Sequence, residues 1–204
     1  KINGINKDSI YDYIKNITNK VEKYPFVESK INDQIILLKN ILKSYGYYFV
    51  NLETSIISNK NNSVDLIYNF NLGDIAKIKN IKFIGDKIYR DNSLRNVIVS
   101  EEAKFWKFLT RNKFLNNNRI NLDTAKLENF YKNRGFYNVK IKSTTALINE
   151  QNQFELIFNI NAGDKFYFNY IKFLNNQNLP LDSIKIFEKK FAKLKGEKYS
   201  KKKI

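Results

Sequence analysis

The 204-residue sequence contains no cysteine, no histidine and no methionine. Without cysteine and histidine, the chain lacks thiolate nucleophiles, imidazole bases and the side chains that most often bind zinc, copper or haem. The lack of cysteine also excludes a disulfide-bonded scaffold, although it does not indicate the cellular compartment. We therefore expect a protein that is not an enzyme and that uses no metal and no other cofactor.

Long apolar runs and an initiator residue are also missing. No stretch approaches the ~20 apolar residues that a helix needs to cross a bilayer, because Lys, Asn and Asp interrupt each candidate. The start of the sequence shows no signal-peptide pattern. We expect an internal part of a longer protein, with any membrane anchor outside these residues.

The acidic residues fit structural roles better than catalytic ones. Asp91, Asp123 and Asp182 are placed where helices are expected to begin, so we interpret them as caps of unpaired backbone amides. Glu101 and Glu102 are adjacent, which prevents them from sharing one helix face as a catalytic pair. No glycine-rich phosphate-binding loop is present.

One aromatic cluster has two interpretations. The run Phe105-Trp106-Lys107-Phe108 is expected to pack between the helices and the connecting loop, since a small module needs large side chains to build its core. The alternative is a membrane-inserting or peptide-gripping patch, which requires an exposed Trp106.

The net charge of +16 comes from 36 basic and 20 acidic residues. Clustered Lys and Arg side chains favour binding to nucleic acid or to an anionic membrane, because they release counterions from phosphates. The lysines are spread along the chain together with many Asn and Ile residues, which is typical of a composition bias and a solvated basic surface. No nucleic-acid partner is expected, and a basic nucleic-acid-binding repeat protein is kept as an alternative.

One segment of the sequence occurs twice. Residues Lys30 to Phe83 correspond to residues Arg119 to Phe173, with an offset of 89 at Gly46/Gly135 and of 90 at Gly73/Gly163. The single inserted residue falls in a polar turn, where insertions are tolerated. The chain is therefore a tandem repeat of one small module.

Each copy contains a helix followed by a hairpin. Apolar residues at spacings of three and four, from Ile31 to Tyr45 and from Ile120 to Tyr131, predict an amphipathic helix that ends at a glycine. Alternating residues then predict two antiparallel strands. These strands are expected at Tyr48–Ile57 with Val64–Phe70, and at Tyr137–Leu147 with Phe154–Ile160.

The segment between the two hairpins completes the module. A strand is expected at Lys77–Ile84, then a turn at Gly85-Asp86, then a helix from Asp91 or Asn92 that carries Leu94, Val97 and Ile98. The element order is β-α-α-β-β, and the fold class is α+β. We expect residues 1–74 to be a module lacking its first strand, residues 75–164 a complete module, and residues 165–204 the N-terminal part of a further one.

This pattern resembles POTRA domains, the periplasmic modules that precede the membrane barrel in outer-membrane proteins of the Omp85 family. The likeness lies in Ile81 to Lys87, in Leu127 to Phe136 and in Ile160 to Asp164. The aromatic cluster, followed by Arg119 and Asp123, resembles the third module of the family's barrel-assembly factors, so the outer copies would be the second and fourth. Asn175-Asn176 departs from the family's glycine-containing turn. The resemblance implies tandem modules, each with a three-stranded mixed sheet packed against two helices.

In a POTRA-like sheet the second strand lies at the edge, where unpaired backbone groups can recruit another strand. Such β-augmentation gives affinity without demanding a particular side-chain sequence. The expected peptide-binding positions are Val50, Leu52, Thr54, Ile56, Val139, Ile141, Ser143 and Thr145. Lys140 and Lys142 on the outer face favour the alternative of an edge blunted against aggregation. The expected structural turns and caps are Gly46, Gly73, Gly85, Gly135 and Gly163.

The resemblance implies a non-catalytic scaffold on the periplasmic side of the cell outer membrane. Such a scaffold binds unfolded outer membrane β-barrel proteins, docks accessory assembly lipoproteins, and reaches the membrane through a barrel absent from this sequence. A second alternative is the POTRA region of a two-partner secretion transporter. It is less favoured because such transporters usually carry two modules, and this sequence shows parts of three.

Overall fold

The computed structural model describes residues 1–19, 25–106, 109–170 and 181–204, apart from the side chains of residues 181–183. The chain divides into two compact units. One comprises Lys1–Ile81, Ser100–Asn118 and Thr145–Leu156, and the other comprises Lys82–Val99, Arg119–Thr144 and Ile157–Ile204. The division therefore passes through the middle repeat. The tip of its hairpin and the loop before its long helix belong to the same unit as the first repeat.

The first module contains a three-stranded mixed sheet in the order β1-β3-β2. Its strands are β1 (Ile2–Asn3), β2 (Asn51–Ser58) and β3 (Val64–Asn71). β1 runs parallel to β3, and β2 runs antiparallel to it in a register from Asn51 opposite Asn71 to Ser58 opposite Val64. The expectation that this module lacks its opening strand is therefore corrected. A two-residue strand is too short to produce an alternating pattern in the sequence.

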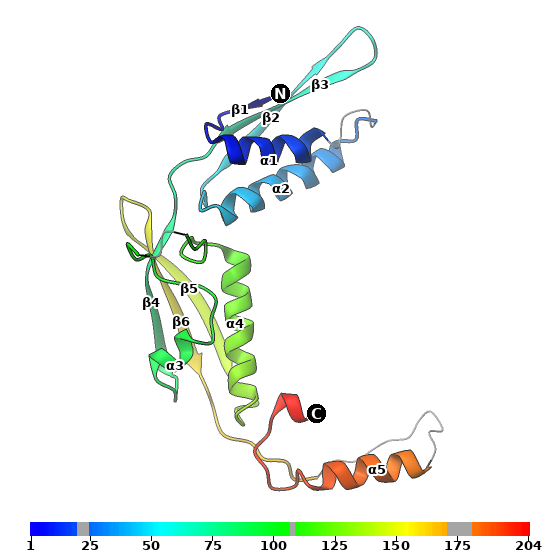
Figure 1. The fold of residues 1–204 in the computed structure, drawn as a ribbon, viewed down its shortest axis with the longest axis vertical. Coiled ribbons are helices and arrows are strands. Elements are labelled where there is room, and N and C mark those ends of the chain that lie inside the picture. The colour runs from blue at the N-terminus through cyan, green and yellow to red at the C-terminus, as the bar shows by residue number, and fades with distance from the viewer. Residues whose placement is uncertain (20–24, 107–108, 171–180) are drawn as a thin grey trace. The chain divides into compact units, whose positions relative to one another are not determined.

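Two helices, α1 (Asp8–Thr18) and α2 (Glu28–Ser44), lie side by side against this sheet (Figure 1). Each presents an apolar stripe at helical spacing, and the stripes meet the inward-facing residues of β2 and β3. The resulting core consists of Ile10, Ile14, Leu38, Leu42, Val50, Leu52, Tyr68 and Phe70. Burial of these side chains is the main force that holds the module together.

One polar pair is buried with this core. The hydroxyl of Tyr68 donates a hydrogen bond of 2.5 Å to Oε1 of Gln34, whose Nε2 donates to the carbonyl oxygen of Ile17 at 3.4 Å. Burial raises the pKa of Tyr68 to about 12, since the ionised form is poorly solvated there. The pair links β3 to both helices through side chains that are almost fully buried.

Helix α2 ends in a two-bond cap around Gly46. The amide of Gly46 donates to the carbonyl of Lys43 at 3.0 Å, and the amide of Tyr47 donates to the carbonyl of Leu42 at 3.1 Å. This Schellman pattern needs a residue with positive φ, and Gly46 has a φ of 100°. Its counterpart Gly135 has a φ of 104°. All of the predicted turn and cap glycines have positive φ: Gly46, Gly73, Gly85, Gly135 and Gly163.

The middle module repeats the architecture with longer strands and shorter helices. Its sheet contains β4 (Lys77–Asp86), β5 (Lys140–Asn149) and β6 (Gln153–Asn161), in the order β4-β6-β5. Its helices are α3 (Asp91–Arg95) and α4 (Asn117–Lys132). The predicted first helix was wrong in its extent, since Val97 and Ile98 lie beyond the end of α3. The α+β fold of tandem modules is confirmed.

The buried carboxylate of Asp123 explains why α3 is short. Asp123 lies within α4, not at its start, so its assignment as a cap was wrong. Its Oδ1 accepts a hydrogen bond of 2.6 Å from the backbone amide of Val99. The chain after α3 is thereby held against α4 as an irregular segment. Burial lowers the pKa of the neighbouring Arg119, and the charge of Asp123 opposes that shift.

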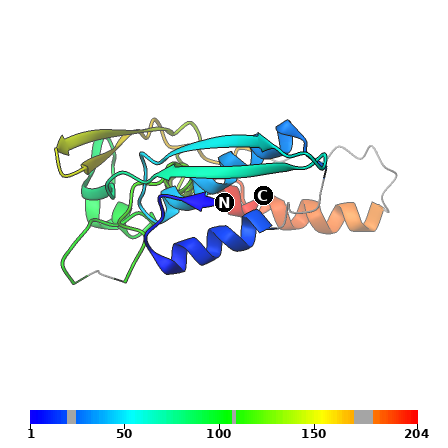
Figure 2. The ribbon, with the colours of Figure 1, turned by 90° about the horizontal axis from the view of Figure 1, so that it is seen from above.

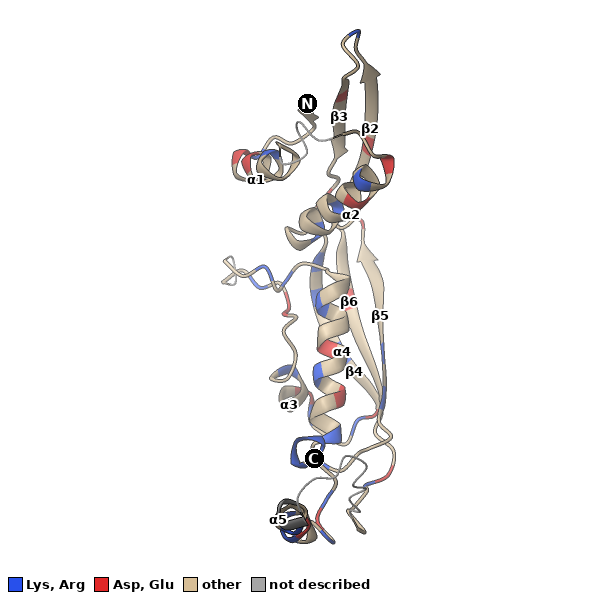
Figure 3. Cartoon of the chain, turned by 90° about the vertical axis from the view of Figure 1, so that its right-hand side faces the viewer, with Lys and Arg blue, Asp and Glu red and all other residues tan. Residues whose placement is uncertain are grey.

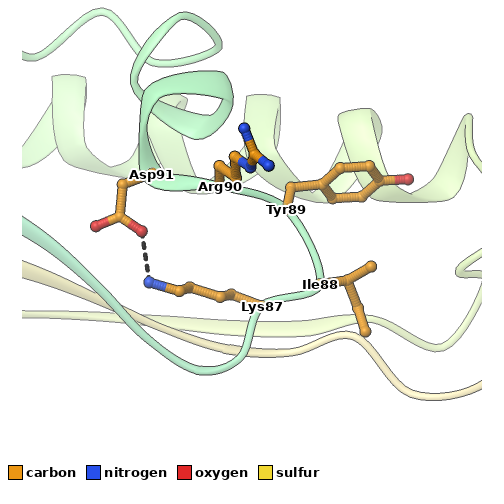
Figure 4. Close-up of a pocket in the computed structure, with 5 residues that line it drawn as sticks. All are labelled: Lys87, Ile88, Tyr89, Arg90 and Asp91. Carbon is orange, nitrogen blue, oxygen red and sulfur yellow. Dashed lines mark hydrogen bonds and ion pairs between the residues drawn. The ribbon is translucent and has the colours of Figure 1, made fainter.

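The other two residues predicted to cap helices are Asp91 and Asp182. Asp91 is the first residue of α3, and its carboxylate pairs with Nζ of Lys87 at 2.5 Å (Figure 4). The N-cap position itself belongs to Arg90. The side chain of Asp182 lies outside the described residues, as does the predicted departure at Asn175-Asn176.

The C-terminal segment repeats features of the middle module. It contains α5 (Leu181–Ala192) and a 3-10 turn, η2 (Lys201–Lys203). An isolated antiparallel bridge joins Tyr167 to Lys198, as another joins Lys77 to Phe114 in the middle module. η2 begins three residues after Lys198 of the first bridge, and α4 begins three residues after Phe114 of the second. The repeat therefore extends to the beginning of the second helix.

The two capping glycines provide a matched pair of variants. A Cβ added at Gly46 would lie 2.7 Å from Ile75 and 3.0 Å from the ring of Phe114, whereas at Gly135 the nearest atom is 3.5 Å away. We expect Gly135→Ala to cost about 1 kcal/mol of unfolding free energy, from the positive φ alone. Gly46→Ala should cost about 2–3 kcal/mol, because steric crowding adds to the same backbone strain. Urea unfolding of both variants measures the difference, and equal losses would contradict the close approach at Gly46.

The Tyr68 hydroxyl should make stability depend on pH. Near neutral pH we expect Tyr68→Phe to lower the unfolding free energy by about 1–3 kcal/mol, because Gln34 loses its buried partner. With a pKa raised from 10 to about 12, Tyr68 ionises first in the unfolded chain as the pH rises. The advantage of the wild type is therefore complete below pH 10 and is lost between pH 10 and about pH 12. Chemical unfolding across this range tests it, and a constant difference would contradict the assignment.

Candidate functional site

The two outer strands of the middle sheet differ in how their outer edges are covered. Along β4, the loop before α4 supplies the missing hydrogen bonds. The amide of Ile78 donates to the carbonyl of Lys113 at 2.8 Å, and the carbonyl of Ile78 accepts from the amide of Ala103 at 2.7 Å. The carbonyl of Ala76 accepts from Leu115 at 3.1 Å. The start of this edge, around Ile78, is therefore closed to an incoming strand.

The opposite edge of the sheet is strand β5. Within the part of the chain that the structure describes, the strand order gives β5 one neighbour, β6. The side chains of Lys140 and Lys142 are exposed there, and Ile141 between them is buried. An outer strand with one side paired presents a row of amides and carbonyls on the other side. β5 is the candidate functional edge.

The predicted binding positions divide into buried and exposed side chains. Val50, Leu52, Val139 and Ile141 are buried in the cores. Thr54 and Ser143 are half-buried, while Ile56 and Thr145 are exposed. The inward-facing side chains cannot contact a docked strand, so pairing at these edges would use the backbone alone.

The predicted edge strands, Tyr48–Ile57 and Tyr137–Leu147, begin too early. Val50 and Val139 lie one residue before β2 and β5, and the residues from the capping glycine to the strand form turns instead. In these turns the amide of Val50 donates to the carbonyl of Tyr47 at 3.4 Å, and that of Val139 donates to Phe136 at 3.3 Å. Alternation in the sequence cannot separate this turn from the strand, because aromatic and apolar residues occur in both.

A repeated junction follows each of these turns. The carbonyl of Gly46 accepts a hydrogen bond of 2.8 Å from the amide of Ala76, and the carbonyl of Gly135 accepts one of 2.8 Å from Phe166. Ala76 and Phe166 each lie two residues after the Gly-Asp pair that ends a hairpin. The helix cap of one module thus binds the opening segment of the next module in the same way twice.

Aromatic rings surround both junctions. At the first, the ring of Phe154 lies 6.2 Å from Tyr48 and 6.0 Å from Phe49. At the second, the ring of Tyr137 lies 5.9 Å from Phe166 and 5.0 Å from Tyr199. The guanidinium of Arg111 also stacks on Tyr45, 3.9 Å from the ring centroid. Such ring contacts add to the area that is buried where modules join.

The aromatic cluster that we expected in a core is exposed. Phe105 and Trp106 are 89% and 58% exposed, and Leu109 is 86% exposed. They lie in the loop between α3 and α4, whose described residues are drawn green in Figure 2. Composition alone cannot separate the two outcomes, because a buried cluster and an exposed one use the same residue types. Phe108 lies outside the described residues.

Charge and small-molecule features do not single out another site. Lys and Arg residues are spread over helices, strands and loops (Figure 3). A shallow depression lined by Lys87, Ile88, Tyr89, Arg90 and Asp91 (Figure 4) contains no pair of carboxylates. No group of three or more acidic side chains in the described ranges is placed to hold a metal. The described helices include none with the length and hydropathy needed to span a membrane.

Comparison with known proteins agrees with this architecture. Residues 76–163 match the family model POTRA, described as a surface antigen variable number repeat. The outer membrane protein assembly factor BamA of Neisseria meningitidis is 26% identical over 142 residues, which are 69% of this chain and 18% of that protein. BamA of Buchnera aphidicola is 21% identical over 184 residues, which are 89% of this chain and 28% of that protein. The chain therefore spans less than a third of the length of these relatives.

A solved structure shares the fold. The crystal structure of BamA from Haemophilus ducreyi lacking POTRA domains 1–3 matches with a TM-score of 0.59 and 18% sequence identity, over 78% of this chain and 27% of that one. Because that structure lacks the first three domains, the match does not assign ordinal numbers to the present modules, and those numbers stay a prediction. Residues 76–163 are therefore similar to the POTRA family, and most of the chain is similar in sequence to parts of BamA proteins.

Proposed function

We propose that this segment is a periplasmic scaffold of an outer-membrane β-barrel assembly protein. It receives unfolded outer membrane proteins by pairing their extended segments with β5 and β2, and it holds accessory lipoproteins near the membrane barrel. The similarity to BamA supports the general role. The docking of strands and of accessory subunits is our own extension of it.

The observation that carries the proposal is the difference between the two edges of the middle sheet. The start of the β4 edge is occupied by backbone groups of Ala103, Lys113 and Leu115, while β5 has β6 as its one strand neighbour in the described chain. Covering one edge and leaving ten residues, Lys140–Asn149, at the other supports a role in strand addition.

Recognition through the backbone suits a varied clientele. Ile141 faces the core, and its neighbours Lys140 and Lys142 face outward, so no deep side-chain pocket lies along the strand. Main-chain hydrogen bonds then provide the affinity, and they form with any extended segment. Long, flexible lysine side chains beside the edge discourage permanent sheet fusion while leaving its amides and carbonyls accessible.

Site-specific crosslinking tests this proposal. Photoreactive side chains are introduced into the full-length protein at Lys140, Lys142 and Thr144, which are all exposed on β5. The buried positions Val139 and Ile141 are avoided, since a bulky probe there would disturb the core. In membranes that are synthesising porin-like proteins, we expect the β5 probes to crosslink to unfolded barrel chains, because a paired strand lies about 5 Å away.

Two exposed lysines provide matched controls. Lys79 lies on β4, in the same sheet but at the closed edge, and Lys126 lies on α4. Probes at both positions should give background yields. Labelling at Lys79 or Lys126 equal to that at β5 would refute strand docking, as would an absence of crosslinks from all three β5 positions.

A further inference from the structure

The outward-facing residues at the start of β5 are both lysines. Lys140 and Lys142 are exposed, and Ile141 between them is buried. Successive residues of a strand point to opposite faces and advance by about 3.3 Å each, so the two lysines share one face about 7 Å apart. From Lys140 to Asn149 the strand contains no acidic residue. The start of this edge therefore presents two positive charges in line along the strand.

These two lysines have their charges available for a partner. Within the described ranges, neither Lys140 nor Lys142 forms an ion pair or a side-chain hydrogen bond, whereas Lys132 pairs with Glu128 at 3.6 Å. Glu155, the acidic residue of the neighbouring strand β6, is engaged in another interaction. A cation without a carboxylate partner gains the most from an acidic group that binding brings beside it.

The equivalent positions of the first module carry no positive charge. At the repeat offset of 89, Lys140 corresponds to Asn51 and Lys142 to Glu53, which are both exposed on β2. There the side-chain amide of Asn51 donates to Oε1 of Glu53 at 3.0 Å, so this carboxylate has a partner on its own strand. The repeat keeps the strand and reverses the charge beside it. The two lysines are thus a property of the β5 edge and not of the repeat.

We propose that β5 prefers extended segments with acidic side chains two residues apart, on the face that Lys140 and Lys142 share. This inference rests on the proposed strand addition at β5 and names the class of segment that the edge favours. A strand paired with β5 has the same two-residue period, so two carboxylates on one of its faces come beside the two ammonium groups. Backbone hydrogen bonds hold the segment, and the charge pairs rank one segment above another.

The position of the lysines favours an extended peptide over a phosphate-rich partner. The lysines stand beside an open strand edge, which offers backbone donors and acceptors alternately. A lipid headgroup or a nucleic-acid phosphate supplies acceptors for the donors and leaves the carbonyls unpaired. An acidic peptide strand supplies backbone groups of both kinds together with its carboxylates.

Synthetic peptides measure the preference directly. A photoreactive side chain replaces Thr144, the next exposed residue after Lys142 on the same face of β5, in the 204-residue chain. Peptides of about ten residues alternate valine and threonine, and two threonines of one face are replaced by Glu, by Gln or by Lys. A fourth peptide carries its two Glu residues at adjacent positions, which places them on opposite faces at the same net charge.

The amount of crosslinked product is followed against peptide concentration at low salt. We expect the peptide with two Glu residues on one face to bind about tenfold more tightly than the Lys peptide and about threefold more tightly than the Gln peptide. The peptide with adjacent Glu residues should bind about threefold more weakly than the one with alternate Glu residues, because one of its carboxylates faces away from the lysines.

Two double variants separate position from net charge. Lys140→Asn with Lys142→Glu places the residues of the first module on β5, and we expect the Lys peptide to bind it more tightly than the Glu peptide. Lys79→Asn with Lys126→Glu makes the same change in net charge at exposed positions of β4 and α4. This second variant should keep the preference of the wild type. Circular dichroism checks that both variants are folded.

The outcomes distinguish this inference from the strand addition on which it rests. Crosslinks from Thr144 that form equally well with the Glu, Gln and Lys peptides would overturn the charge preference and leave strand addition intact. An absence of crosslinks with every peptide would overturn both. Equal binding of the adjacent and alternate Glu peptides, or a preference lost in the variant of Lys79 and Lys126, would reduce the effect to attraction between net charges and refute the inference.

Discussion

The hydrogen bond from one module to the carbonyl of the preceding helix cap is the contact on which the tandem arrangement depends. The carbonyl of Gly46 accepts from Ala76, and that of Gly135 accepts from Phe166, at the same distance of 2.8 Å. A carbonyl is available there because the Schellman cap reverses the chain at a residue with positive φ. A side chain at Gly46 would also meet Ile75 and Phe114. One glycine therefore ends a helix, starts the path toward a strand and receives the next module.

The parts of this structure that could be predicted from sequence depend on local rules. Gly46 and Gly135 were identifiable because a left-handed cap strongly favours glycine. The hairpins were identifiable because one face of each strand is buried, which forces alternation. The length of helix α3, which has five residues, was overestimated because Val97 and Ile98 continue its apolar spacing. After the helix, the chain is held instead by the hydrogen bond from the amide of Val99 to Asp123.

Features that depend on nonlocal contacts could not be predicted in this way. An aspartate near the start of a helix is usually a cap, and nothing in the sequence around Asp123 shows that it lies six residues inside α4. The closed edge of β4 is made by backbone groups of Ala103, Lys113 and Leu115, which leave no side-chain signature. The same limit applies to Trp106, since an aromatic cluster has one composition whether it is buried or exposed.

A closed edge limits the number of strands that can be added to a sheet. A sheet with two open edges can be extended in both directions, so an array of such sheets could be joined by a single client into a continuous, irreversible β-structure. In the middle module the loop removes one of these directions, and in the first module the corresponding strand, β1, is two residues long. Under the proposed strand addition, the middle module would therefore accept one strand, at β5. Any strand that it accepts also becomes the new terminus of the sheet.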